Sequence, residues 1–417
     1  MNGLVSTGEE CMSPHPDVTK FDLLNVPSAY FADQYRHFAA LRECSPIHCN
    51  SGGTFIVARC DHCAAAYRDP VTWSSGKRAD FARKFGNAAT LYEQHSTSVV
   101  FTVAPNHTRI RKLFRRALTR RALAAFEPRI ANFVDTCLDH LEATGEMDMV
   151  EEISFKLPIE VVRDLLGGPG CDRDMIRGRT LAILTALEPM LTAEQHADGN
   201  RAVIEFKQYL RDLIRRRRSF PDEASPTEVL TVRADAVADG VRLTELELLH
   251  QCIFMLNAGH ESSTKALSHG VHEMLRSHGE VRRLAENQGS VDTIVDEVLR
   301  YQAPNQNNNR RSTKDTEIGG LPMPAGTTVH VIVSAANRDP RQFPDPDRLD
   351  MARAANRRLS FGPGVCNCAG ISLARMEAAI ALRKPFGRFP ELQLMAPPEI
   401  ATRLRFREIR HLHIAVN

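Results

Sequence analysis

Hydrophobic positions recur with helical spacing along most of the first 300 residues of the chain. From about residue 31 to residue 300 this pattern predicts helices, interrupted by a short strand over residues 54–57 and a loop-like region over residues 80–106. Later in the chain Asn, Pro and Gly accumulate, and residues 327–333 alternate as a strand does. A last helix is predicted over residues 368–384, ending at a proline. The pattern therefore predicts a mostly α-helical protein with a small β portion contributed late.

One predicted helix is apolar around most of its circumference. It begins in the stretch TELELLHQCIFMLNAGHESST, where Thr244 and Glu247 have the spacing of a capping box. A helix that is apolar on so many sides is a buried one. Ala258 and Gly259 interrupt its large side chains, so either another group approaches the backbone there or the glycine serves packing. Glu261 follows, and a buried carboxylate is costly unless it is paired or used.

The composition narrows the class of protein. Lys and Arg total 53 against 51 Asp and Glu, which argues against a nucleic-acid-binding protein. Ten cysteines are spread over 417 residues, a length that needs no disulfides, so we expect reduced thiols and a cytoplasmic protein. No apolar run approaches the ~20 residues that a membrane span needs. Without repeats or linkers, residues 31–417 are expected to form one structural unit, preceded by an irregular arm over residues 1–30.

The stretch SFGPGVCNCAG carries the most specific chemistry. Gly362 and Gly364 permit a tight turn, and the helix that follows would direct backbone N–H groups and its positive end toward Cys368. Such surroundings lower the pKa of a thiol and stabilise a thiolate, which suits the axial ligand of a haem iron. Cys366 lies inside the turn, too early for the helix terminus.

Two other uses of these cysteines stay open. Cys366 and Cys368 could join Cys60 and Cys63 of the stretch CDHC in a zinc site, although Cys-x-Cys is tighter than the spacing that zinc sites favour. A cysteine nucleophile paired with a histidine is a further alternative, with no local signature to support it.

The stretch SFGPGVCNCAG resembles the haem-binding loop of the cytochromes P-450, which are haem-thiolate monooxygenases, and here of the soluble bacterial kind. The resemblance runs from about residue 31 to the C-terminus and implies a single large helix-rich domain that encloses haem b. Cys368 would be the axial ligand, with Phe361 beside its sulfur. Glu297 and Arg300 match the family's Glu-x-x-Arg helix, where the two side chains share one face. Arg353 takes the place of the second arginine of that network.

The resemblance also implies which residues contact the haem. Its carboxylates need cations, and His107, Arg111 and Arg310 match positions that serve this purpose in the family. Arg358 matches a fourth position, which is often a histidine in the family. The full set implied for the cofactor is His107, Arg111, Ala258, Gly259, Arg310, Arg358, Phe361, Gly362, Cys368 and Gly370.

The segment AGHESS matches the oxygen-activating part of the family's central helix. Glu261 would be the acid and Ser262 the alcohol that deliver protons, with serine where threonine is usual. Serine keeps the hydroxyl but lacks the methyl group that fixes the rotamer. Cys366 is a second departure, since the family generally carries His or Arg there.

The implied reaction inserts one oxygen atom from dioxygen, the co-substrate, into a small organic substrate. Because Ser262 replaces threonine, an atypical haem-thiolate oxidase or peroxygenase (coupling, dealkylation or rearrangement) is the alternative, and a haem-binding sensor without turnover is a more distant one. Electrons would come from a separate ferredoxin-type protein, steered to a basic face. That face comprises Arg109, Arg111, Lys112, Arg115 and Arg116.

Position in the family pattern assigns six residues to the substrate pocket: Phe81, Phe85, Phe101, Met255, Asn305 and Asn307. The run NQNNN, residues 305–309, is polar for the edge of a haem pocket. It either hydrogen-bonds a polar substrate or satisfies local backbone groups. We therefore expect a substrate with at least one polar anchor, such as an aromatic acid or a hydroxylated natural-product intermediate.

Overall fold

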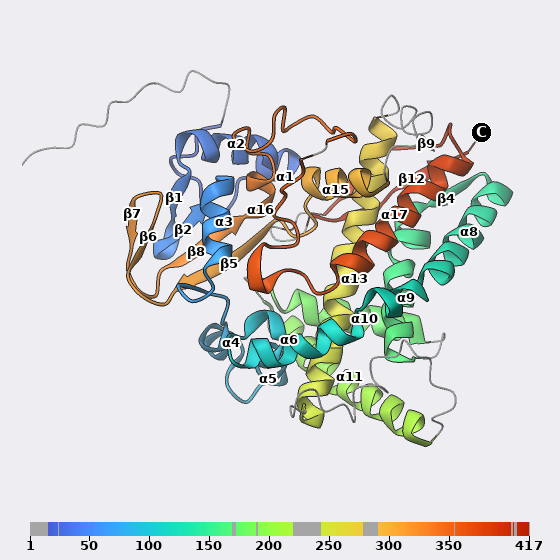
Figure 1. Ribbon diagram of the computed structural model, residues 1–417, viewed down its shortest axis with the longest axis horizontal. Coiled ribbons are helices and arrows are strands. Elements are labelled where there is room, and N and C mark those ends of the chain that lie inside the picture. Colours follow the sequence, from blue (N-terminus) through green and yellow to red (C-terminus); the bar gives the residue numbers. More distant parts are fainter. Residues whose placement is uncertain are drawn as a thin grey trace, which may run out of the picture.

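The architecture is that of a computed structural model of the chain. It describes residues 16–23, 25–168, 172–188, 191–219, 243–277, 291–353, 355–401, 403 and 407–416. Helices form most of the molecule, and the largest sheet lies to one side of them (Figure 1). The mostly α-helical fold with a small β portion is therefore confirmed.

The helices of the described residues run from Ser28 to Arg388. They are α1 (Ser28–Ala32), α2 (Gln34–Cys44), α3 (Cys60–Arg68), α4 (Arg78–Phe85), α5 (Thr90–Thr97), α6 (Asn106–Ala117), α7 (Arg120–Ala124), α8 (Glu127–Thr144), α9 (Lys156–Leu166), α10 (Arg173–Thr185), α11 (Ala193–Ser219), α13 (Glu245–Arg276), α15 (Val291–Tyr301), α16 (Val333–Ala336) and α17 (Ile371–Arg388). Short 3-10 turns are η1 (Ser51–Gly53), η2 (Val99–Phe101) and η6 (Gly364–Cys366), and η3 (Val150–Ser154) is a π-helical turn.

The strands of the described residues form one larger sheet and three small ones. They are β1 (Ile47–Asn50), β2 (Thr54–Val57), β3 (Trp73–Ser74), β4 (Glu146–Asp148), β5 (Asn307–Ser312), β6 (Thr316–Ile318), β7 (Leu321–Met323), β8 (Thr328–Ile332), β9 (Gln393–Leu394), β10 (Glu399–Ile400), β11 (Ile409–His411) and β12 (His413–Ala415). The larger sheet has the order β1-β2-β8-β5-β3, in which only β2 and β8 are parallel. The others pair β4-β12-β9, β10-β11 and β6-β7. Strands β2 and β8 confirm the two strands expected from sequence.

Helix α13 runs through the middle of the molecule (Figure 1). Its capping box is present, since Thr244 accepts from the N–H of Glu247 and the Glu247 side chain accepts from the N–H of Thr244. Helices α9, α11, α15 and α17 all pack against it. Most of its residues are buried, as the pattern predicted, although Leu246 in its first turn is exposed.

Two expected boundaries were wrong. The loop-like region over residues 80–106 contains α4 and α5, because Phe81, Phe85 and His95 pack their rings against one another and bury two short helices. The last helix also continues past Pro385 to Arg388. Pro385 and Phe386 are both buried there, and this packing offsets the hydrogen bond that the proline removes.

The expected N-terminal arm is packed where the structure describes it. Residues 16–23 and 25–27 form no helix or strand, yet Val18, Phe21 and Leu23 are buried in a cluster with Tyr30. His48 contacts the carbonyl of Phe21 at 2.7 Å. This segment therefore contributes to the core beside α2.

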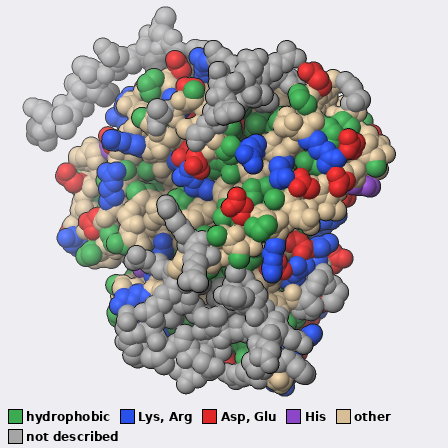
Figure 2. Space-filling view, turned by 45° about the vertical axis from the view of Figure 1, so that its right-hand side comes forward, with side chains coloured by type: hydrophobic (Ala, Val, Ile, Leu, Met, Phe, Trp, Pro, Cys, Tyr) green, Lys and Arg blue, Asp and Glu red, His purple; other side chains and the backbone are tan. Residues whose placement is uncertain are grey.

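Charges of both signs mix on the side turned forward in Figure 2. Helices α8 and α17 meet through such pairs, with Lys384 bound to Asp135 at 2.7 Å and Arg388 to Asp139 at 2.6 Å. Within the described ranges, the structure has no helix long and apolar enough to cross a membrane.

Candidate active site

The loop before α17 turns sharply at two glycines. Gly362 and Gly364 have φ of 68° and 84°, a region that side chains other than glycine rarely adopt. The end of α3 lies against this turn, with the Tyr67 carbonyl 3.5 Å from where a Cβ on Gly364 would stand. The turn therefore needs the glycines for their positive φ, while a Cβ on Gly364 would stand at ordinary contact distance from α3.

Three hydrogen bonds, to two residues elsewhere in the fold, fix the start of this loop. The Ser360 hydroxyl donates to the carbonyl of Leu299 at 2.6 Å, which ties the loop to α15. Asn337 binds it twice, donating to the Ser360 hydroxyl at 2.8 Å and accepting from the N–H of Leu359 at 2.7 Å. Sequence reasoning missed Asn337, because this contact depends on a fold in which distant segments meet.

Cys368 lies at the end of the turn, three residues before α17. Its N–H donates to the carbonyl of Phe361 at 2.8 Å, and the N–H of Gly370 faces its sulfur. Arg111 of α6 donates to the carbonyl of Asn367. The Cys368 side chain is accessible to solvent although protein atoms surround it closely, so it lies in a concave part of the surface.

The net pKa of the Cys368 thiol differs from the expectation. Burial raises it, and the N–H of Gly370 and the charge of Arg111 lower it by less. The expectation that the surroundings lower the pKa of this thiol was therefore wrong for the protein chain alone. The N–H of Gly370 and the charge of Arg111 reduce the free-energy cost of forming the thiolate, but the loss of solvation outweighs them. A bound metal ion deprotonates a coordinating thiol outright.

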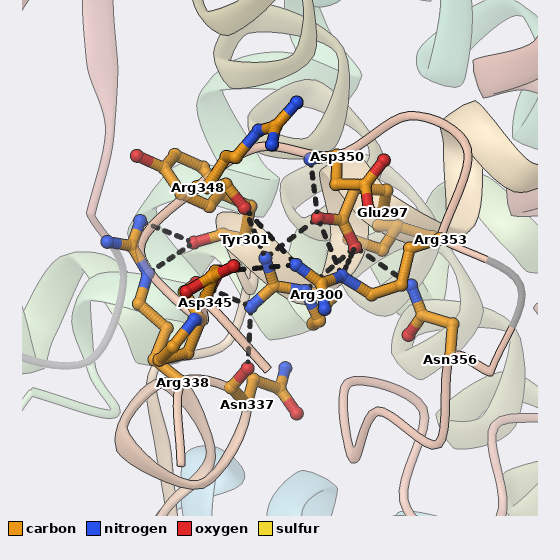
Figure 3. A network of polar contacts seen from close by, with 12 residues as sticks. Glu297, Arg300, Tyr301, Asn337, Arg338, Asp345, Arg348, Asp350, Arg353 and Asn356 are labelled. Carbon is orange, nitrogen blue, oxygen red and sulfur yellow. Dashed lines mark hydrogen bonds and ion pairs between the residues drawn. The ribbon is translucent and has the colours of Figure 1, made fainter. Parts of the chain in front are cut away.

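Glu297 is the centre of a buried polar network (Figure 3). It is 0% exposed and accepts from Arg300 at 2.7 and 2.8 Å and from Arg353 at 3.1 and 3.2 Å. Asn356 and the N–H of Asp350 add bonds at 3.2 and 2.9 Å. The carboxylate is thereby saturated with donors.

Arg300 extends this network to the loop between α16 and the cysteine turn. Its guanidinium donates to the carbonyls of Asn337, Pro346 and Arg348 at 2.9, 2.8 and 3.1 Å. A planar group with five donors is suited to binding several carbonyls and a carboxylate at once. The pair on α15 therefore holds the loop that leads to Cys368.

One stripe of α13 is less buried than the rest. Ala258 is exposed, while Met255 and Ser262, one turn before and one turn after it, are partly buried. The Ser262 hydroxyl donates to the carbonyl of Ala258 at 2.8 Å. Gly259 points elsewhere, since a Cβ there would meet Val162 of α9 at 2.8 Å. The structure thus favours the packing interpretation for Gly259.

Glu261 lies on a buried side of α13. Its carboxylate pairs with Lys265 one turn on and with Arg403 at 3.1 Å, and Arg403 also binds Glu188 and Glu408. Burial raises the pKa of Glu261, but Lys265 and Arg403 outweigh it and hold the pKa below its usual value. Among the described residues no hydrogen bond joins Glu261 to Ser262. Sequence reasoning missed both cationic partners.

The four expected haem-carboxylate ligands differ in how they are engaged. His107 is buried on α6, where burial and Arg111 lower its pKa. Arg310 on β5 lies over the ring of Tyr67 at 4.7 Å. Arg358 already has a carboxylate partner, Asp296, at 2.6 Å.

Comparison with known proteins identifies the family. The cytochrome P450 family model matches residues 74–397. The chain belongs to the cytochrome P450 family. The 6-deoxyerythronolide B hydroxylase of Saccharopolyspora erythraea is 32% identical over 375 residues, 88% of this chain and 91% of that protein. The vitamin D(3) 25-hydroxylase of Pseudonocardia autotrophica is 36% identical over 373 residues, 88% of each. The crystal structure of CalO2 superposes with a TM-score of 0.88 at 28% identity, covering 96% of this P450 and 99% of CalO2.

This P450 is therefore a monooxygenase, an oxidoreductase that uses haem b with dioxygen as co-substrate. Such enzymes act on small organic substrates and need a redox partner. The residues present fit the group: one accessible thiol in a concave surface, a stripe of small side chains on α13, and cations on α6 and β5.

The residues expected in the substrate pocket fall into two groups. Phe81 and Phe101 are in edge contact at 4.9 Å, and Phe81 belongs with Phe85 to a core cluster against which Phe101 and Met255 pack. Asn305 donates to Asn308 at 3.2 Å, and its buried Oδ1 has no partner among the described residues. Asn307 begins β5 and pairs with Ile332.

The zinc alternative finds no support in the described residues. Cys60 and Cys63 are buried in α3, and burial raises the pKa of the Cys60 thiol to about 12. Cys63 donates to the carbonyl of Val57 at 3.2 Å. The described His, Cys, Asp and Glu side chains form no cluster that brings either cysteine together with Cys368.

Proposed function

We propose that Cys368 is the axial thiolate of the haem iron in this monooxygenase. The observation that carries the proposal is the placement of its accessible sulfur beside the N–H of Gly370, at the end of a loop fixed by Asn337. Bound haem supplies the oxidising chemistry. The chain contributes a held sulfur, flanking apolar groups such as Phe361 and Ala258, the cations Arg111 and Arg310 for the haem carboxylates, and His107 as a neutral hydrogen-bond donor to them.

The carbon monoxide spectrum of the reduced protein tests this ligand. A red-shifted, thiolate-type Soret band is expected in the wild type and in Cys366→Ala, and it should be absent in Cys368→Ala. Cys366→Ala is the matched control, because it removes a thiol two residues away in the same loop. A band that survives Cys368→Ala and disappears in Cys366→Ala would contradict the assignment.

We infer that Ser262 delivers protons on the less buried stripe of α13. Its hydroxyl donates to the carbonyl of Ala258, and its oxygen can accept from water, so the hydroxyl has to rotate away from Ala258 to pass its proton on. A route that also uses Glu261 has to include Lys265 and Arg403, since both hold its carboxylate. These contacts support a role in which Glu261 supplies protons through neighbouring groups and not directly to Ser262.

The product formed per reduced nicotinamide consumed measures this role. Ser262→Thr keeps the hydroxyl and adds the rotamer-fixing methyl, so coupling should rise, whereas Ser262→Ala should lower it. With labelled dioxygen, label in the product indicates monooxygenation. Unlabelled product would favour the atypical oxidase that serine in place of threonine invites.

We propose a ferredoxin-type donor that docks on the basic face of α6. Arg109 is paired with Glu247, and Arg111 binds the cysteine loop. Lys112 is exposed on the same helix and is the probe chosen for this face. The side chains of Arg115 and Arg116 lie outside the described residues. Lys112→Glu should slow reduction by an acidic ferredoxin, most strongly at low salt, while Arg83→Glu on α4 should not. Equal rates in both variants would exclude this face.

We propose a substrate with a polar anchor near Asn305. The buried Oδ1 of Asn305 without a partner among the described residues supports this, because such a group is costly unless a ligand or water reaches it. Asn305→Leu or Asn307→Leu should weaken substrate binding in a spectral titration. Unchanged affinity in both variants would exclude the anchor.

We also propose a cytoplasmic location. The eight described cysteines are all free, which fits a reducing compartment such as the cytoplasm.

A further inference from the structure

Two histidines and one aspartate meet where the small sheet β4-β12-β9 lies next to the end of β11. Asp148 ends β4, His411 ends β11, and His413 begins β12. His413 is the register partner of Asp148 across the β4–β12 pair. One potential ligand atom from each of the three side chains lies within 4.8 Å of the other two. The haem chemistry described above uses none of them.

The two imidazoles are already oriented alike. His411 and His413 are two residues apart in extended chain, so their side chains project from the same face. Their ring planes differ by 6° with centroids 6.0 Å apart. Both rings are exposed, which leaves space for water beside them.

Asp148 is held in place by the backbone. Its Oδ1 accepts from the N–H of Val150 at 3.0 Å and from the N–H of Leu412, the residue between the histidines, at 3.1 Å. Its Oδ2 faces Nδ1 of His411 at 2.7 Å. The carboxylate is thus fixed next to both rings before any ion arrives.

We propose that Asp148, His411 and His413 bind a divalent first-row transition-metal ion such as Zn²⁺ or Ni²⁺. Imidazole and carboxylate are the ligands that these ions take, and water completes the coordination at an exposed site. Donors around such an ion lie about 3.3 Å apart, so the exposed rings need to move by about an ångström. The ion would fasten the ends of β11 and β12 to β4, the strand that follows α8.

Ni²⁺ titration of the haem-loaded protein by calorimetry tests the site, with Ni²⁺ as the probe itself. The wild type is expected to show one binding event that weakens by about tenfold or more in His413→Ala and in His411→Ala. Both histidines are exposed, so these variants should fold. His140→Ala on α8 removes another exposed histidine and should bind Ni²⁺ as the wild type does.

Thermal unfolding gives a second readout. Because the ion binds only the folded sheet, Ni²⁺ should raise the Tm of the wild type and of His140→Ala but not that of His413→Ala, and a chelator should reverse the rise. Equal Ni²⁺ affinity in the wild type and His413→Ala, or no binding by the wild type, would overturn the proposal.

Discussion

Glu297 on α15 and Glu377 on α17 are both almost fully buried, at 0% and 2% exposure, but their surroundings differ. Glu297 accepts from two arginines, one asparagine and one backbone N–H. Glu377 has a hydrogen bond from Ser263 of α13, while its Oε2 has no partner among the described residues. The carboxylate of Glu297 therefore lies between two positive charges, whereas that of Glu377 lies in the buried interior with the hydroxyl of Ser263 as donor.

The difference shows that the hydrogen-bonding and ionic partners of a buried acid, more than its burial, decide whether it holds other segments in place or changes charge with pH. Desolvation raises the pKa of Glu377 to about 7, and Ser263 lowers it only in part. Glu297 instead organises a loop, because the arginine that it holds also binds three loop carbonyls. Glu297 therefore has a structural role, whereas the pKa of Glu377, about 7, lets its charge change near neutral pH.

Breaking the Glu297 network should have the largest effect. Glu297→Ala leaves Arg300 and Arg353 buried without their carboxylate, and removing one partner of a buried pair costs about 3–5 kcal/mol. Denaturant unfolding and haem content are the measurements. Glu151→Ala is the control, since it breaks a partly exposed bidentate pair with Arg177 and should cost at most about 1 kcal/mol. Similar losses in the two variants would contradict the structural role of Glu297.

Removing the charge of Glu377 should change stability only at higher pH. Its pKa is about 7 in the folded chain against a usual 4.5, so the native state binds more protons between these values. Its contribution is fully present below pH 4.5 and is lost as the pH rises through about 7, a difference of about 3 kcal/mol. Glu377→Gln should thus match the wild type near pH 4.5 and exceed it at pH 8.

Unfolding midpoints measured from pH 4.5 to pH 8 on both proteins test this. Other titrating groups are common to the two, so the difference between the curves reports Glu377 alone. Curves that run parallel across this range would show that Glu377 does not titrate there.

Sequence patterns could predict that Glu297 pairs with an arginine, but they could not predict that Glu377 is buried. The spacing of Glu297 and Arg300 is local, so a helix alone places them together. Arg353 needed the family resemblance, and the bonds from Asn356 and Asp350 depend on a loop conformation that no local pattern encodes.

Glu377 has no local signature either. A single glutamate in a helix with arginines nearby is typical of a surface position, and only the packing of α17 on α13 buries it. The same limit applies to Glu261, whose partner Arg403 lies 142 residues away, and to α4 and α5, whose short turns are fixed by ring packing. The fold class could be predicted because its hydrophobic periodicity extends over hundreds of residues, and the cysteine loop could be predicted because its motif is one contiguous stretch.

The smallest expected effect comes from the bond between Ser263 and Glu377. Ser263→Ala removes a donor that favours the charged form, so the pKa of Glu377 should rise further. The cost at pH 8 should be about 1 kcal/mol, the usual net worth of one hydrogen bond, and should shrink toward pH 4.5. Ser268→Ala, another buried serine on α13 that bonds only within its helix, should leave the pH profile unchanged.

A second variant separates this bond from mere packing. In a Glu377→Gln background, Ser263→Ala should no longer alter the pH dependence, because no titrating group is left for Ser263 to bias. If Ser263→Ala shifts the profile equally in both backgrounds, another acid senses Ser263. A small shift would show that one neutral hydroxyl stabilises the charged form of Glu377 only weakly, which leaves the two guanidinium groups around Glu297 as the main source of the contrast between the two acids.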